Sequence, residues 1–251
     1  LIIIFNVNVN ALTVGTYHTD GSVTDKDGKV LRKSYADRYQ EALDSFNKDD
    51  YVKAIILRID SPGGSVAPSQ EIYHKVNEIK LSKKKPIIAS VNNMAASGGY
   101  YIAIGADMIV VNSGSIVGSI GVIMSHPIAK KLLDNLGVDF KTYKSGEFKD
   151  SGSPYRYSSK NDSIYFNQVV ADLHSQFIAW VKKRRGKRLK ANDEVLFNAG
   201  VWSGSKAKEL GLIDGIGDYY NVMKNIFGDD IKFKDFSKKT SWFKQKFLSN
   251  G

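Results

Sequence analysis

The sequence predicts an α/β fold with a mainly parallel sheet and flanking helices. Strand-like and helical patterns alternate through the first 145 residues, which is the order that βαβ units with right-handed crossovers produce. Residues 52–59 are continuously apolar apart from Arg58, as expected for a parallel strand buried on both faces. The 251 residues, 42% of them hydrophobic, are enough for a sizeable core.

The expected elements of the first half follow from residue patterns. Runs rich in β-branched residues predict strands, and apolar stripes between a capping residue and a stop predict helices. The expected strands are residues 2–9, 11–17, 52–59, 86–91 and 107–111, with a Gly/Asp-rich loop at 20–28. The expected helices are 34–47, 66–81 and 97–106, the first with an apolar stripe formed by Tyr35, Tyr39, Ala42, Leu43 and Phe46.

The second half is less regular. Residues 114–124 are apolar but punctuated by Gly and Ser, which indicates close packing against backbone or ligand. The expected helices are 127–136 (closed by Gly137), a long one that starts at Ser159 or Asn161 and ends in the basic run, 205–210 and 217–227, and the expected strand is 138–144 before a polar loop at 145–157. No linker separates two domains, so we predict one domain over 1–228 and a basic, aromatic tail over 229–251, with a short strand after Asp229.

Composition limits the possible chemistry. The chain has no cysteine, which excludes disulfides and thiolate chemistry, and no metal site or cofactor is predicted. The formal net charge is +10, and much of it lies in residues 182–190 (KKRRGKRLK) and the tail. A basic surface favours nucleic acid or membrane headgroups, although a solvated lysine-rich face is an equally good interpretation. We expect a membrane surface rather than nucleic acid.

The N-terminal end offers little for a membrane span. Residues 1–5 are apolar but too few to cross a bilayer. The chain begins at Leu1 rather than Met, which we interpret as a fragment or mature form from which an upstream anchor has been removed.

Ser97 is the strongest candidate nucleophile. It stands where an apolar strand gives way to a helix, followed by two glycines, and a helix start offers backbone N–H groups without partners inside the helix. The alternative is an N-cap serine with glycines for tight packing. The turn at residues 61–64 ends another strand, and ligand sites in such sheets lie beyond the carboxyl ends of strands. The amides of Gly64 and Gly98 are therefore expected to form an oxyanion hole over the Ser97 hydroxyl.

A serine nucleophile needs a base. Of the histidines, His74 and His174 lie on expected helices, and only His126 is a plausible imidazole base. A lysine serves instead if burial lowers its pKa enough to give a neutral amine. Composition alone leaves several candidates open, among them Lys141, Lys144 and Lys149.

Five motifs occur in order along the chain. They are DSPGGS at 60–65, NNMAASGGYYIA at 92–103, GSIGV at 118–122, YKSGEFKDSGSP at 143–154 and WSGSKAKELGLIDGIG at 202–217. Together they resemble the signal peptide peptidase A family of serine proteases, over roughly residues 12–227. The two strand-end turns also resemble the wider Clp protease and crotonase-like superfamily, which implies a fold of repeated ββα and βαβ units. The segment at 6–22 and the tail after Gly228 are less typical.

The resemblance assigns roles to individual residues. It implies Ser97 as the nucleophile, Lys149 as the general base and Ser119 as a residue that hydrogen-bonds the lysine. The oxyanion donors correspond to the Gly64 and Gly98 amides, with Gly63 as the nearest competitor, and Lys144 is then structural or on the substrate side. No histidine is required.

The resemblance also implies an assembly and a substrate. The base is expected to reach the serine from a neighbouring subunit of a homo-oligomer, an octamer for a chain of this size. Peptide substrates are expected to be signal peptides left after preprotein processing, cleaved on the outer face of a bacterial-type cytoplasmic membrane. Candidate walls of an apolar groove, each of which is otherwise a plain core residue, are Met94, Ile116, Val117, Ile120 and Val122.

Two rival interpretations come from other classes. A crotonase-like acyl-CoA enzyme uses the same two amides without a nucleophile, but it needs neither a serine at 97 nor a lysine at 149. A non-catalytic scaffold or membrane-binding module is supported only by the basic charge.

Overall fold

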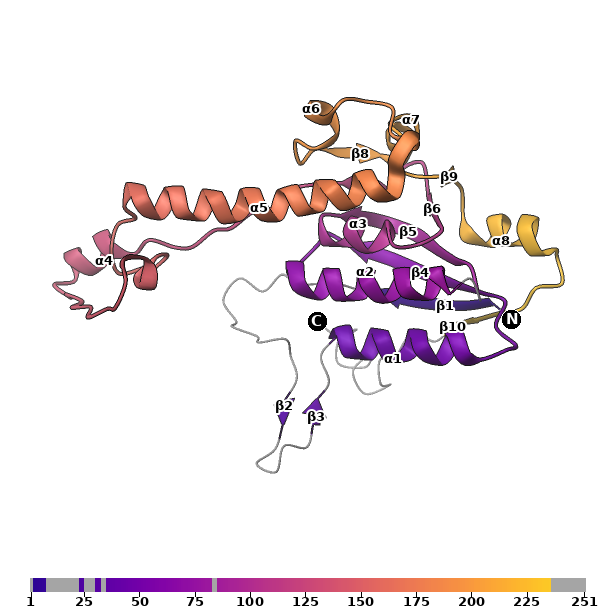
Figure 1. Cartoon of the computed structure of the whole chain (residues 1–251), viewed down its shortest axis with the longest axis horizontal. Helices are drawn as coiled ribbons and strands as arrows, with labels where there is room; N and C mark the ends of the chain where they lie inside the picture. The colour runs from indigo at the N-terminus through magenta and orange to yellow at the C-terminus, as the bar shows by residue number, and fades with distance from the viewer. Residues whose placement is uncertain (1, 8–22, 25–29, 33–34, 83–84, 236–251) are drawn as a thin grey trace, which may run out of the picture. The chain divides into compact units, whose positions relative to one another are not determined.

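A mainly parallel sheet organises the chain in the computed structural model, which describes residues 2–7, 23–24, 30–32, 35–82 and 85–235 (Figure 1). Two compact units are present, Leu1–Ile120 with Val181–Gly251 (unit 1) and Gly121–Trp180 (unit 2). The expected strand at 11–17 and most of the expected tail lie outside the described residues. The boundary expected at residue 228 stays a prediction.

The sheet belongs to unit 1 and confirms the predicted fold class. Its strand order is β10 (Phe233–Asp235), β1 (Ile2–Val7), β4 (Ala54–Ser61), β5 (Ile87–Ala96), β6 (Met108–Val111) and β9 (Gly215–Ile216), all paired in parallel. A second branch adds β7 (Ile116–Gly118), parallel to the end of β5, and β8 (Val201–Ser203), antiparallel to β7. A separate antiparallel pair, β2 (Val23–Thr24) and β3 (Val30–Arg32), lies partly in the segment expected to be a loop.

The helices agree with most of the expected positions. They are α1 (Tyr35–Lys48), α2 (Val66–Leu81), α3 (Gly98–Ala103), α4 (Lys130–Asn135), α5 (Lys160–Arg185), α6 (Asp193–Leu196), α7 (Gly204–Glu209) and α8 (Tyr219–Phe227), with 3₁₀ turns η1 (Glu147–Asp150) and η2 (Gly186–Arg188). Helices α1 and α2 lie side by side, and α2 packs on α3 (Figure 1). The buried apolar side chains of α2 recur at Ile72, Val76 and Ile79, one face of a 3.6-residue period.

Strand β5 runs five residues further than the apolar run predicts. One residue of β4, Asp60, faces the β5 stretch Asn92–Asn93–Met94, because the pairing shifts between Ile59↔Val91 and Ser61↔Ala95. The side-chain amides of Asn92 and Asn93 both donate to Asp60 Oδ2, at 3.1 and 2.8 Å. Such a bulge bends a strand and re-aims it, and here it carries β5 into its pairing with β7.

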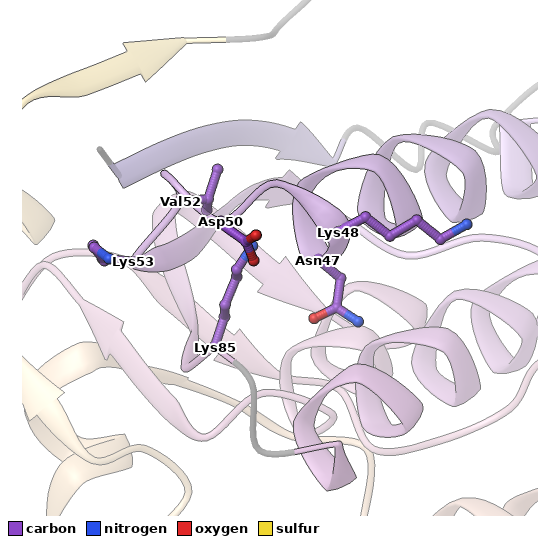
Figure 2. A pocket seen from close by; sticks show the side chains of 6 residues that line it. All are labelled: Asn47, Lys48, Asp50, Val52, Lys53 and Lys85. Carbon is purple, nitrogen blue, oxygen red and sulfur yellow. The ribbon is translucent and has the colours of Figure 1, made fainter.

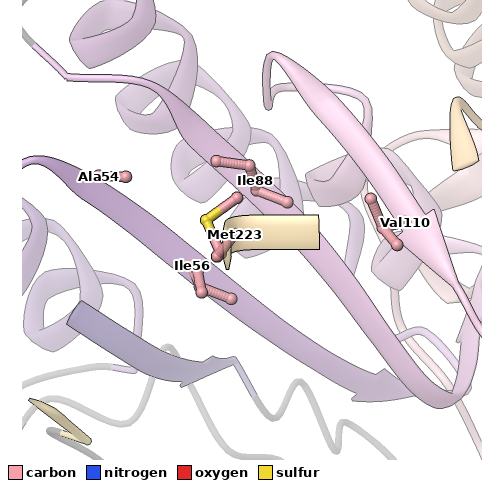
Figure 3. Packing of buried hydrophobic residues seen from close by; sticks show 5 residues of the cluster. All are labelled: Ala54, Ile56, Ile88, Val110 and Met223. Atoms are coloured by element: carbon pink, nitrogen blue, oxygen red, sulfur yellow. The ribbon is translucent and has the colours of Figure 1, made fainter. Parts of the chain in front are cut away.

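One face of the sheet is closed by α8. Met223 of α8 is fully buried against side chains of β4, β5 and β6, namely Ala54, Ile56, Ile88 and Val110 (Figure 3). Both faces of β4 are buried along most of its length, which confirms the predicted two-sided strand.

We expect Ile56→Ala to lower the free energy of unfolding by about 2–5 kcal/mol, because the side chain is fully buried and its removal leaves a cavity. Urea unfolding at fixed pH measures this. Ile226→Ala is the matched control, since Ile226 is 51% exposed, and it should change stability by less than about 0.5 kcal/mol. Equal effects at the two positions would contradict the assignment of the core.

The basic run at the end of α5 is largely used inside unit 1, not held as a free basic patch. Arg184 donates to the carbonyl oxygens of Ile104, Gly105 and Ala106 just after α3, at 2.8–3.2 Å. Arg185, 3% exposed, donates to Gly211 O at 2.9 Å and pairs with Asp214 at 2.8 Å. Arg188 pairs with the other oxygen of Asp214 at 2.9 Å, so these guanidinium groups stabilise helix ends and turns.

Asp214 is the anion at the centre of these contacts. Burial acts to raise its pKa, but the hydrogen bond and charge of Arg185, with smaller contributions from the Ile109 amide and Arg188, outweigh burial and leave the pKa below its usual value. Asp214 also accepts from Ile109 N at 2.8 Å. The LIDGIG part of the C-terminal motif therefore fixes the β6–β9 edge of the sheet.

In unit 2 the expected strand at 138–144 is wrong. The segment is extended coil, and the side chains of Val138, Phe140 and Tyr143 are 41%, 50% and 83% exposed. Within the described residues no neighbouring strand pairs with this segment, and a strand needs such a ladder. Unit 2 holds most of the exposed large hydrophobic side chains of the described chain: Ile123, Met124, Ile128, Leu132, Leu136, Val138, Phe140, Tyr143, Phe148, Tyr155, Tyr157, Ile164 and Tyr165.

Candidate functional site

Ser97 occupies the joint between β5 and α3, as predicted, in a strained conformation. Its φ is 51° and its ψ is −121°, a region that non-glycine residues rarely adopt and that costs on the order of 1–3 kcal/mol. Its amide donates to Gly118 O at 2.9 Å, and its carbonyl accepts from Tyr101 N at 2.9 Å. The side chain makes no capping hydrogen bond to α3, so the alternative role of an N-cap is not the one its hydroxyl performs.

The Gly63–Gly64 turn lies directly against Ser97. A Cβ atom placed on Gly63, whose φ is +114°, would meet Ser97 Cβ at 2.6 Å and Gly98 N at 3.1 Å. A Cβ on Gly98 would meet Gly64 N at 3.3 Å. Both turns thus need glycine in order to approach each other this closely.

The backbone amides of Gly63, Gly64 and Gly98 differ in their hydrogen-bond partners. Gly63 N donates to the buried Ser61 Oγ at 3.1 Å, so this N–H is already occupied. Gly64 N and Gly98 N donate to no other residue in the described part of unit 1. Two unoccupied N–H groups beside a serine have the composition of an oxyanion hole.

Gly63→Ala is expected to lower kcat by about 10²-fold or more, because the added methyl group displaces the Ser97 backbone and a misplacement of about 1 Å has an effect of that size. A peptide-cleavage assay with separate kcat and KM values measures it. Gly114→Ala is the matched control, since a Cβ there meets nothing within 4 Å. If Gly63→Ala cleaves as fast as Gly114→Ala, the close approach of the two turns has no catalytic consequence.

Ser119 directly follows Gly118, and the carbonyl oxygen of Gly118 accepts the hydrogen bond from Ser97 N. Its φ is 50°, and its amide donates to Gly200 O at 2.7 Å. A Cβ on Gly118 would meet the Trp202 ring at 2.7 Å. The C-terminal motif therefore supports the Ser119 turn, and Ser97 and Ser119 come together within unit 1.

The five proposed groove residues have different surroundings. Met94 is half-buried, and its strand neighbour Ile116 is 37% exposed. Val117 and Ile120 are fully buried core residues, and Val122 is half-buried in unit 2. Of the five, the residues of unit 1 whose side chains remain partly exposed are therefore Met94 and Ile116.

The two lysines of the KSGEFK motif differ in their contacts within unit 2. Lys144 Nζ bonds Asp150 Oδ1 at 2.6 Å and Glu147 O at 2.8 Å. Lys149 is exposed on η1, and its side chain has no partner in the described part of unit 2. His126, the candidate imidazole, contacts Ser158 Oγ at 3.2 Å and the Phe166 ring, and no carboxylate among the described residues hydrogen-bonds it.

A pocket of about 500 Å³ lies at the opposite end of β4, where α1 leads into the strand (Figure 2). Its lining includes Lys48, Lys53 and Lys85. Lys85 is 6% exposed and donates to Phe46 O at 2.7 Å and to Asp49 O, so its ammonium caps the end of α1. In the described ranges, no cluster of His, Asp or Glu is suited to a metal ion.

Sequence reasoning missed several supporting residues. Ser61 and Asp60 were seen only as turn residues, although one occupies the Gly63 amide and the other holds the β5 bulge. Ser69, 1% exposed, has its Oγ within 2.5 Å of a Cβ placed on Gly98. Asp60 and Ser61 are the first two residues of the DSPGGS motif and Ser69 follows that motif by four residues, but no sequence pattern marks their supporting contacts.

Comparisons with known proteins identify the family. The model of peptidase family S49 matches residues 79–227, and that of Clp protease matches residues 28–111. The chain belongs to peptidase family S49.

Two relatives show the extent of the similarity. A candidate protease of Methanocaldococcus jannaschii is 37% identical over 78% of this chain and 62% of its own length. A candidate signal peptide peptidase SppA of Enterococcus faecium is 34% identical over 83% of this chain and 61% of its own length. The chain thus spans about three fifths of the length of these relatives.

Solved structures agree on the fold. Two variants of the 1510-N membrane-bound stomatin-specific protease align with TM-scores of 0.52 and 0.50, at 15% and 17% identity. The alignments cover 95% and 99% of this chain and 98% and 96% of theirs, and the second variant was in complex with a substrate peptide. Among the described residues, no helix combines the length and apolar character needed to cross a bilayer.

Proposed function

We propose that this chain is a serine endopeptidase with a Ser97–Lys149 dyad. The observation that carries the proposal is the strained Ser97, whose hydroxyl is not used as a cap and which lies beside the unoccupied amides of Gly64 and Gly98. Membership of peptidase family S49 supports the same chemistry.

The proposed reaction is acyl transfer. A neutral Lys149 amine takes the Ser97 proton, the serine oxygen attacks the peptide carbonyl, and the amides of Gly64 and Gly98 hold the oxyanion. The ammonium then protonates the leaving amine, and water releases the acyl group by the same steps. Ser119 hydrogen-bonds and orients the lysine. The occupied amide of Gly63 favours Gly64 as the second oxyanion donor.

Lys149 rather than Lys144 is supported as the base by the contacts in unit 2. Lys144 is already committed to Asp150 and Glu147, whereas the Lys149 side chain is left without a partner. A lysine amine becomes a base when burial excludes water from it. We propose that a neighbouring subunit supplies this burial in a homo-oligomer, an octamer with sites shared between subunits. The exposed apolar side chains of unit 2 are consistent with such contacts.

The proposed substrates are hydrophobic signal peptides left after preprotein processing. The similarity to a candidate signal peptide peptidase supports this class, and the partly exposed apolar side chains of Met94 and Ile116, on strands that pair near the end of β5, would be available to a hydrophobic peptide. We further propose action at a membrane surface, on the outer face of a bacterial-type cytoplasmic membrane. The net charge of +10 would favour anionic headgroups there.

The test is labelling with a fluorophosphonate probe followed by mass spectrometry of the labelled peptide. The proposal predicts a single adduct on Ser97 and a parallel loss of peptide cleavage. An adduct on a different serine, or cleavage that persists after complete labelling, would refute Ser97 as the nucleophile.

A further inference from the structure

The turn that carries Lys149 is held on both sides while the lysine side chain itself stays unbound. The turn η1 begins after Gly146, whose φ is +93°. Asp150 immediately follows Lys149, and its carboxylate is the meeting point of two cations. The contacts that hold Asp150 in place therefore also hold the adjacent backbone of Lys149 in place.

Arg156 is the residue that ties this turn to the start of α5. Its Nε and Nη2 donate to the two oxygens of Asp150, both at 3.0 Å. Its Nη1 and Nη2 donate to the two oxygens of Asp162, at 2.5 and 2.9 Å. A planar guanidinium that bridges two carboxylates in this way fixes their relative orientation, which a lysine ammonium does not.

Asp162 anchors the other end of the bridge. It is 2% exposed and accepts from Ser151 Oγ at 2.6 Å, just after the Lys149 turn. It also accepts from Ser159 N at 2.7 Å, while its own amide donates to Ser159 Oγ at 3.0 Å. This reciprocal pair is a capping box at the start of α5, so the turn is tied to the first turn of that helix.

A second set of contacts stabilises the beginning of the turn, at Glu147. Lys144 bonds both Asp150 Oδ1 and Glu147 O. Asn161 donates to Glu147 Oε1 at 2.7 Å. The residues before and after Lys149 are thus cross-braced to α5.

We propose that Arg156, acting through Asp150 and Asp162, is a positioning residue that sets the direction of the Lys149 amine, a role that depends on the proposed function. A general base must lie within hydrogen-bond reach of the proton it takes. The contacts of Arg156, Lys144 and Asn161 brace the backbone around the base, while the Lys149 side chain itself makes no such contact.

Protonation of the two carboxylates, Asp150 and Asp162, is expected to destabilise this network at acid pH. The hydrogen bonds from Arg156, followed by those from Lys144, hold the pKa of Asp150 below its usual value. Those from Arg156, Ser151 and Ser159 hold the pKa of Asp162 far below it. Because both values are lowered by folding, the stabilisation is present above about pH 4 and is lost as the pH falls further. We expect the amide-exchange protection factors of residues 147–151, corrected for the intrinsic pH dependence of exchange, to be lower at pH 3 than at pH 6, and unchanged protection factors would contradict this.

The positioning role is tested by kcat, KM and pH–rate profiles of Arg156→Met, Arg156→Lys and Asp150→Asn in the full chain. We expect Arg156→Met to lower kcat by about 10²-fold with little change in KM. The rising limb of its pH–rate profile should move to higher pH, because a loosely held amine is more exposed to water. Arg156→Lys keeps the charge without the double bridge and should recover only part of kcat. Asp134→Asn is the matched control, since it breaks an ion pair with Lys130 in the same unit, and it should behave as wild type.

These variants distinguish the positioning role of Arg156 from the Ser97–Lys149 dyad itself. If Lys149→Met is inactive but Arg156→Met and Asp150→Asn keep the wild-type kcat and pH profile, the positioning role is overturned and the dyad stands. If Lys149→Met stays active, the dyad itself is overturned. Should Arg156→Met fail to fold by circular dichroism, Arg156→Lys and Asp150→Asn decide: a loss confined to KM, or no loss, rejects positioning.

Discussion

Ser97→Ala is expected to abolish peptide cleavage, with a loss of at least about 10³-fold in kcat and no adduct with a fluorophosphonate probe. The hydroxyl is the attacking group in the proposed reaction, and an alanine has nothing with which to replace it. A peptide-cleavage assay and probe labelling on the same preparation measure both effects.

Stability is the control for this variant. Alanine occupies the same positive-φ backbone position, and the serine side chain makes no capping bond to lose, so the melting temperature should stay close to that of wild type. Ser45→Ala, on the exposed side of α1, should label and cleave as wild type. A folded Ser97→Ala protein with more than about a tenth of wild-type kcat would contradict the nucleophile assignment.

Lys149→Met should lower kcat by about 10²–10⁴-fold, the usual contribution of a general base, and should abolish the rise of the wild-type rate with pH. Methionine retains much of the apolar stem but has no amine. Because the Lys149 side chain makes no hydrogen bond or ion pair with the described residues of unit 2, the fold should be unaffected.

Lys144→Met is the informative comparison for this prediction. That lysine belongs to the same motif, but it bonds Asp150 and Glu147. Its loss should loosen the turn and lower kcat by about tenfold, with the pH dependence retained. If Lys144→Met removes the pH-dependent limb and Lys149→Met does not, the roles of the two lysines are reversed.

Much of the fold could be predicted because its elements follow local patterns. The two-sided apolar run of β4 and the stripe of α2 were found with nearly correct ends. Strand β5 was predicted too short, since Asn92–Asn93 has the composition of a turn, and only the Asp60 carboxylate, 32 and 33 residues away, makes a bulge of it. The segment at 138–144 has the composition of a strand but no partner among the described residues.

The candidate site, too, was predictable from the sequence in some features and not in others. The adjacency of the two glycine turns followed from the rule for strand ends in parallel sheets, and the structure brings them together. The basic run could not be interpreted correctly, since the partners of Arg184, Arg185 and Arg188 lie about 26–80 residues away. The Arg156 bridge was missed for a different reason: its partners are near in sequence, but nothing in the pattern of the 145–157 loop marks them.

In the proposed mechanism, an amine of one subunit activates the serine of another. Complementation tests it most directly: Ser97→Ala and Lys149→Met chains, each inactive alone, are co-assembled and assayed. A shared site predicts recovery to about a quarter of wild-type activity per chain, because each active site then needs an intact serine from one variant and an intact lysine from the other. Mixed oligomers that form, as seen by native mass spectrometry, and yet stay as inactive as either parent would contradict it.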